Sequence, residues 1–255
     1  MGVAWMKKRH QRLLNVERVT SPVRVVWVDR LRGMAILLMV GYHFCFDLNY
    51  VGWIAQDFNH QLFWLGLRTL IVALFLGLVG VSLVLAQRDG VHDWRKCWSR
   101  WQRLALNAAL VSLASYALFP ESFIFFGVLH FILLVSVLGV WMLRWTTALL
   151  SGGGMVSLLL GVLVQAPFFD QPAWQWVGMM THKPLTEDYV PLLPWLGVVM
   201  GGMALAKHYP QWFCVTPVTP QRDILGWLGR HGLWVYMAHQ PVLLGGLWWV
   251  SGVRG

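Results

Sequence analysis

The chain has 255 residues, of which 57% are hydrophobic and only 12% are charged. This composition excludes a soluble globule, a disordered chain and a collagen-like repeat, because each of those needs a more polar or more repetitive sequence. The net charge of +9 is expected to reflect basic cytoplasmic loops of a membrane protein, with no nucleic-acid partner. The three cysteines are an odd number without metal-type spacing, so no disulfide framework is expected.

The expected elements, in chain order, are a basic tail and seven membrane-spanning helices. Residues 1–28 are basic and lack a long apolar run, so they are expected to form a cytoplasmic tail ahead of a membrane domain at 29–255. Each span needs about 20 apolar residues. The sequence places the spans at 33–54, 62–87, 102–119, 123–143, 146–168, 190–206 and 231–250. The glycine run at 151–154 predicts an irregularity in the fifth span, and the longest outer loop is expected at 169–189.

The positive charges predict the orientation of these spans. With the N-terminus in the cytoplasm, most of the 20 Lys and Arg residues fall on the cytoplasmic side, as the positive-inside rule requires. An even number of spans would move several of these charges to the other side. The predicted fold is therefore an all-α polytopic transmembrane bundle with a cytoplasmic N-terminus. A bacterial inner membrane is the expected location.

A polar stripe runs along the first span. Arg32 and His43 are eleven residues apart, which is almost three helical turns, so their side chains share a face about 16 Å apart. Asp47 lies one turn beyond His43, within hydrogen-bonding range. A carboxylate beside an imidazole fixes its tautomer and stabilises its protonated form, so the stripe predicts His43 as a catalytic base oriented by Asp47. Two structural alternatives stand beside this: a histidine satisfied by a backbone carbonyl or by another helix, and a solvated Asp47 at the outer interface.

Several blocks of the chain, in order, resemble one membrane enzyme family. The Arg32–His43 spacing resembles the first-helix motif of the transmembrane acyltransferase superfamily. The stretch 29–50 resembles the small bacterial branch of the heparan-alpha-glucosaminide N-acetyltransferase catalytic family. Further blocks that resemble this family are 75–82, 126–131, 191–195, 228–231 and 236–241. The resemblance therefore covers residues 29–241.

Further polar residues in the expected spans are candidates for the site. Arg68 keeps its charge and needs an acidic partner or a watery cavity, for which Asp47 is the expected partner; the alternative is snorkelling to the outer interface. Residues expected to bind substrate are Ser82, which closes the 75–82 block, His130, His239 and Tyr236, which shares a helical face with His239. A lone histidine in a span is equally often an interhelical hydrogen-bond former.

The resemblance implies transfer of an acyl group, most simply acetyl, from a coenzyme A thioester to a sugar hydroxyl or amine outside the membrane. His43 is then the general base or a transient acyl carrier. Arg32 is expected to meet the phosphates of acetyl-CoA. The cluster Arg95, Lys96, Arg100 and Arg103 is expected first of all to set the topology of the spans, with phosphate binding as the alternative. The expected partners are this donor, a glycan or amino-sugar acceptor and membrane lipids, with a homo-oligomer left open. No metal or haem is expected.

Two functions of other classes fit some of the same residues. A transporter or proton-coupled flippase also places His, Asp and Arg within its spans, and it would move substrate without releasing coenzyme A. A membrane cytochrome would use His43, His130 and His239 as haem ligands, although these histidines lack the paired spacing for two haems.

Overall fold

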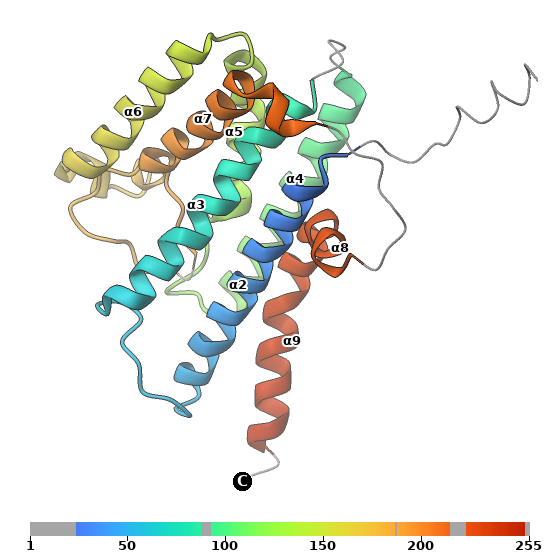
Figure 1. The fold of residues 1–255 in the computed structure, drawn as a ribbon. Coiled ribbons are helices and arrows are strands. Elements are labelled where there is room, and N and C mark those ends of the chain that lie inside the picture. Colours follow the sequence, from blue (N-terminus) through green and yellow to red (C-terminus); the bar gives the residue numbers. More distant parts are fainter. Residues whose placement is uncertain (1–23, 88–92, 187, 215–222, 253–255) are drawn as a thin grey trace, which may run out of the picture.

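The computed structural model describes residues 24–87, 93–186, 188–214 and 223–252. Within these ranges the chain forms eight α-helices, three short 3₁₀ helices and no β-strand (Figure 1). The α-helices are α2 (Val26–Tyr50), α3 (Leu62–Leu85), α4 (Trp94–Leu118), α5 (Val128–Met142), α6 (Thr147–Leu163), α7 (Leu192–His208), α8 (Ile224–Arg230) and α9 (Gly232–Gly252). The 3₁₀ helices are η1 (Pro167–Asp170), η2 (Gln175–Val177) and η3 (Pro210–Phe213).

The all-helical class is confirmed, and each of the seven expected spans overlaps one long helix. The expected basic tail lies almost entirely outside the described residues. The helix ends differ from the expected ones where local hydrogen bonds decide them. For example, α4 begins well before the expected residue 102, because the Asp93 carboxylate accepts hydrogen bonds from the backbone N–H groups of Arg95 and Lys96 and so caps the helix.

The sequence did not predict the short helix α8. The Asp223 carboxylate accepts a hydrogen bond from the backbone N–H of Gly226 and starts this helix. The same carboxylate accepts from the Nε of Arg30 on α2 at 3.2 Å. The backbones of α8 and α2 are in close contact, since a Cβ on Gly229 would lie 1.9 Å from the Asp29 carbonyl oxygen. As a result α8 packs along the first turns of α2 (Figure 1).

Helix α7 contacts both α3 and α6 extensively. Glycines bring the backbones together: a Cβ on Gly202 would lie 2.1 Å from the Gly77 carbonyl oxygen, and one on Gly80 would lie 2.1 Å from that of Val199. The expected irregularity at 151–154 is wrong. These residues are regular helix within α6, and the role of Gly154 is to let α6 approach the backbone of Gly197 on α7.

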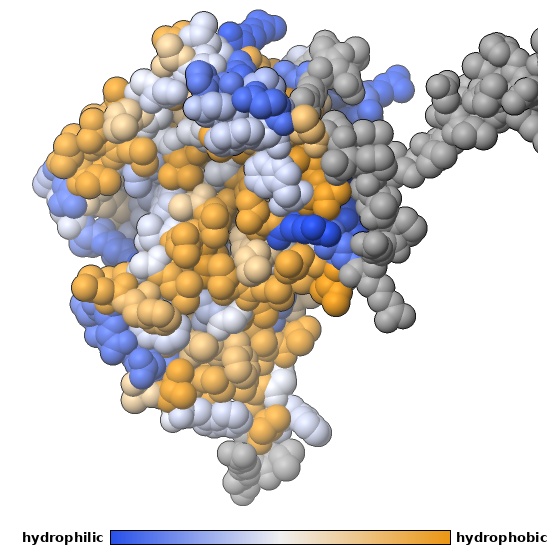
Figure 2. Space-filling model, viewed as in Figure 1, coloured by the Kyte–Doolittle hydropathy of each residue, from blue (hydrophilic) through white to orange (hydrophobic). Residues whose placement is uncertain are grey.

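Much of the outer surface is apolar. Among the described helices, α2 and α3 are long and apolar enough to cross a membrane, and α5 and α6 are shorter apolar helices. Figure 2 shows apolar residues over much of the middle of one face, with hydrophilic residues at the top and along parts of its left and right edges. Large exposed hydrophobic side chains on α4, α6 and α9 include Leu106, Leu113, Leu159, Leu163, Trp248 and Trp249. Together with the two apolar helices, this surface suggests a membrane protein.

Candidate active site

Two histidines from opposite ends of the chain form the centre of the candidate site. His43 on α2 and His239 on α9 face each other, with ring centroids 4.9 Å apart and ring planes tilted by 60°. His239 Nδ1 lies 2.6 Å from the Tyr236 carbonyl oxygen, so Nδ1 carries the proton in the neutral ring and Nε2 keeps a lone pair. That Nε2 and the Nδ1 of His43 are buried, and neither has a hydrogen-bond partner among the described residues. Such orphaned nitrogens are uncommon and leave this pair able to accept protons.

A second polar contact joins the same two helices one turn further on. The Asp47 carboxylate, only 2% exposed, accepts a hydrogen bond of 3.3 Å from the Nε2 of Gln240. The His43 imidazole faces His239, while Gln240 comes from α9 to meet one oxygen of Asp47. That Asp47 orients His43 stays a prediction.

The Arg32 guanidinium lies at the other end of the stripe, where α2 meets α3. Its Nη1 donates to Asp29 at 2.8 Å and its Nη2 donates to the Ser82 hydroxyl at 2.7 Å. Asp29 is buried, so its carboxylate balances the Arg32 charge within the protein. From α4, the guanidinium of Arg100 lies close enough to Arg32 for the two charges to repel each other. The described part of this end therefore carries an excess of positive charge.

A half-buried carboxylate that the sequence did not single out, that of Asp188, lies near the start of α5. Asp188 accepts hydrogen bonds on one oxygen, Oδ2, from the backbone N–H of Val128 at 2.8 Å and from the hydroxyl of Tyr236 at 3.2 Å. Burial raises the pKa of the Asp188 carboxyl, while these two hydrogen bonds act in the opposite direction. Since Tyr236 is one turn before His239 on α9, Asp188 is linked to the histidine pair through that helix. No sequence pattern marks Asp188, because its partners come from two distant segments.

Two other candidates have structural partners. His130 Nε2 lies 3.2 Å from the Ser112 hydroxyl, and its Nδ1 accepts from the backbone N–H of Gly127 at 3.3 Å. Both ring nitrogens are thus engaged, as in the interhelical alternative. The positive charge of the Arg68 guanidinium lies near enough to the Tyr42 hydroxyl to act on it, and Tyr42 is next to His43 in the chain.

A single family model covers all the segments that carry the site residues. The sequence matches the catalytic domain of heparan-alpha-glucosaminide N-acetyltransferase over residues 24–241. The chain belongs to this family. The matched range holds both histidines and the pair Asp47 and Gln240. It also holds Arg32 with its partners Asp29 and Ser82. Neither the comparison with curated proteins nor that with solved structures found a match.

Family membership and geometry together show which expected site residues meet. The structure joins Arg32 with Ser82, and His43 with His239. It brings Tyr236 to a carboxylate, although that carboxylate is Asp188. These three contacts link three helices, α2, α3 and α9, and the segment before α7, so the candidate site of this family domain is built by tertiary contacts and not by one helical stripe.

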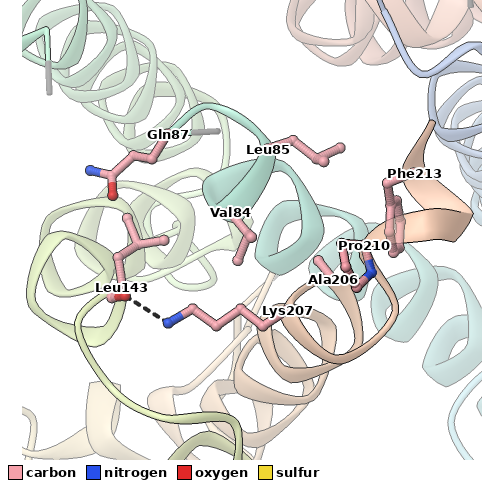
Figure 3. Close-up of a pocket in the computed structure, with 8 residues that line it drawn as sticks. All are labelled: Val84, Leu85, Gln87, Leu143, Ala206, Lys207, Pro210 and Phe213. Carbon is pink, nitrogen blue, oxygen red and sulfur yellow. Dashed lines mark hydrogen bonds between the residues drawn. The ribbon is translucent and has the colours of Figure 1, made fainter. Parts of the chain in front are cut away.

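A cavity of about 250 Å³ lies apart from these residues (Figure 3). It is lined by the last turns of α3 and α7 together with η3 and Leu143. Lys207 Nζ donates to the carbonyl oxygen of Leu143 at 2.6 Å (Figure 3). It also donates to the carbonyl oxygen of Trp145 at 2.6 Å. Its ammonium group thereby satisfies carbonyls at the end of α5, a structural role that agrees with the charge preference of a helix C-terminus.

Proposed function

We propose that this protein is a membrane-embedded acetyltransferase that moves an acetyl group from acetyl-CoA to an amine or hydroxyl of a sugar. Seven long helices cross the membrane with the N-terminus in the cytoplasm, so that donor and acceptor arrive from opposite sides. Three observations support this arrangement: the family match, the apolar surface, and the gathering of Lys and Arg residues at 1–32 and 88–103. A bacterial inner membrane is the proposed location.

The donor binds at the Arg32 end. Arg32 and Arg100 carry two guanidinium groups against the single buried carboxylate of Asp29, and Arg95, Lys96 and Arg103 lie on the same helix as Arg100. The phosphates of acetyl-CoA supply the missing negative charge through charge-assisted hydrogen bonds. Ser82 holds Arg32 in place from α3.

The acyl transfer takes place at the histidine pair. An acceptor ammonium or hydroxyl must lose a proton before its nitrogen or oxygen attacks the thioester carbonyl, and His43 is the base for that proton. The new bond to the carbonyl carbon forms, the carbon–sulfur bond breaks, and the thiolate of coenzyme A leaves. In a second route His43 itself attacks and carries the acetyl group until the acceptor displaces it. His239 adds a second imidazole that accepts a proton at Nε2.

The observation that carries the proposal is the pair of orphaned nitrogens within the family-matched range. A buried nitrogen without a partner costs stability, so its presence on two facing imidazoles is best explained by a role in proton transfer. Asp47 and Arg68 are proposed to contact the acceptor on one side of the histidine pair. His130 is proposed to line the acceptor site. A transporter would use the same ionisable groups, but the acetyltransferase family gives it no support.

The test is acetyl transfer in membranes that contain the protein. Labelled acetyl-CoA is supplied with a panel of amino sugars and glycans, and labelled product and free coenzyme A are measured together. His43→Ala is expected to abolish transfer. His60→Ala is the matched control, because that imidazole is exposed and its polar partner among the described residues is Asp57. Full activity of His43→Ala would remove the mechanism, and substrate flux without release of coenzyme A would favour the transporter.

A further inference from the structure

Helix α9, which carries His239, packs along α2 and, at its start, against α8. Near Tyr236 it also packs against the main apolar core. Other side chains of the helix are exposed, including those of Trp234, Val242 and Trp249. Polar contacts are directional, so those of α9 bear most directly on the position of His239 relative to His43.

The contact between Tyr236 and Asp188 ties α9 to the part of the protein that α2 does not reach. Asp188 lies just before α7, and its Oδ2 also caps the first turn of α5 through the backbone N–H of Val128. Among the described residues, no other hydrogen bond or ion pair joins α9 to α5 or to the segment that leads into α7. One oxygen atom thus connects three elements.

The surroundings of Asp188 hold its carboxylate in this place. A Cβ on Gly127 would lie 2.3 Å from Oδ2, so only glycine leaves room for the carboxylate at the start of α5. The Tyr236 ring packs against the main apolar core, and its centroid lies 5.6 Å from that of His239. A shift of the Tyr236 hydroxyl would therefore be passed directly to the imidazole one turn away.

We propose that Asp188 is a positioning residue for the histidine pair, acting through Tyr236 to fix α9 and thereby the approach of His239 to His43. The inference rests on the proposed acetyl transfer for its kinetic consequence. It assigns a role to a loop carboxylate that lies outside the helices carrying the two histidines.

A double-mutant cycle tests this role, with Tyr236→Phe and Asp188→Ala as single variants and their combination as the third. Each single variant is expected to lower kcat per folded molecule about tenfold, which corresponds to about 1.4 kcal/mol. The KM for acetyl-CoA is expected to stay unchanged, because the donor binds at the Arg32 end. The double variant is expected to be no slower than the slower single variant. Asp188→Asn keeps an acceptor oxygen and is expected to recover part of the rate.

The matched control is Tyr189→Phe. Tyr189 follows Asp188 directly, but its hydroxyl donates to the Gln175 carbonyl oxygen and contacts the Met180 sulfur within the same loop region. This variant loses a tyrosine hydroxyl without touching α9, so its kcat should match that of the wild type.

Two results would overturn the proposal. One is an unchanged kcat per folded molecule in Tyr236→Phe, which would mean that the contact only supports folding. The other is a double variant about a hundredfold slower than the wild type, because multiplied effects mean that the two residues act separately. If the wild type transfers no acetyl group to any acceptor, the proposed function fails. The same cycle measured on the thermal unfolding midpoint then still decides whether Asp188 holds α9 through Tyr236.

Discussion

The close approach of α3 and α7 gives a sharp prediction for Gly202→Ala. The added Cβ would lie 2.1 Å from the Gly77 carbonyl oxygen, whereas ordinary van der Waals contact begins near 3.4 Å. Both the oxygen and the Cβ are fixed to helix backbones, so a side-chain rotation gives no relief. The two helices must separate by about 1 Å in a tightly packed core, and overpacking of this kind costs about 1–3 kcal/mol.

The neighbouring Gly201 provides the control. A Cβ there has no atom within 4 Å, and the residue is exposed on the same helix. Both substitutions gain the roughly 0.5–1 kcal/mol by which alanine exceeds glycine in a helix, so the difference between the two variants measures the clash alone. For a domain of this size, each kcal/mol corresponds to roughly 2–4 °C in the unfolding midpoint.

The assay is thermal unfolding of the purified protein in detergent, followed by the fluorescence of its 17 tryptophans. Gly201→Ala is expected to unfold at the wild-type temperature or slightly above it, and Gly202→Ala several degrees lower. Equal midpoints for the two variants would refute the reasoning, because they would show that α3 and α7 do not meet at this glycine.

Three further predictions concern the contacts of α2, α5 and α8. Lys207→Met should lower the free energy of unfolding by about 1–3 kcal/mol, because the carbonyls of Leu143 and Trp145 lose their donor; an unchanged unfolding midpoint would contradict this. Asp29→Asn should cost about 1.5–3 kcal/mol, since Arg32 loses its charged partner beside Arg100, and a second change, Arg32→Gln, should recover part of the loss in the same assay. The backbone N–H of Gly226, followed by Arg30, lowers the pKa of Asp223, so its contribution to stability is present above the unfolded pKa and is lost as the pH falls through the lower folded pKa. Unfolding midpoints measured from pH 6 down to about pH 3 should therefore fall less steeply for Asp223→Asn than for the wild type, and parallel curves would count against this role.

The sequence was sufficient for the helices because their signal is local. Long apolar runs with polar breaks mark α2, α3 and α5 directly. A helix end differs from the predicted one where a side chain accepts hydrogen bonds from backbone N–H groups, as Asp93 does at the start of α4. The short helix α8 could not be predicted from hydropathy, since its seven residues are held by contacts with α2 and by the Asp223 cap.

The candidate site was predictable only in part, because spacing along one helix gives the face of a residue and not its partner. The polar stripe predicted a shared face for His43 and Arg32, and the structure places both on α2, with contacts to other helices. The same spacing suggested an Asp47–His43 pair. In the structure α9 brings His239 to His43 and Gln240 to Asp47. Asp188 was missed for a related reason: a loop acid gives no sign of which distant hydroxyl it will meet.

The polar contact between Asp47 and Gln240 joins residues 193 positions apart. Contacts of such long range form late, since nearly the whole polypeptide must be made before the last helix can reach the first. A ribosome-bound intermediate that stops short of α9 would contain the Arg32 and Ser82 contact but no facing imidazoles. The histidine pair can thus form only after the last helix has been made.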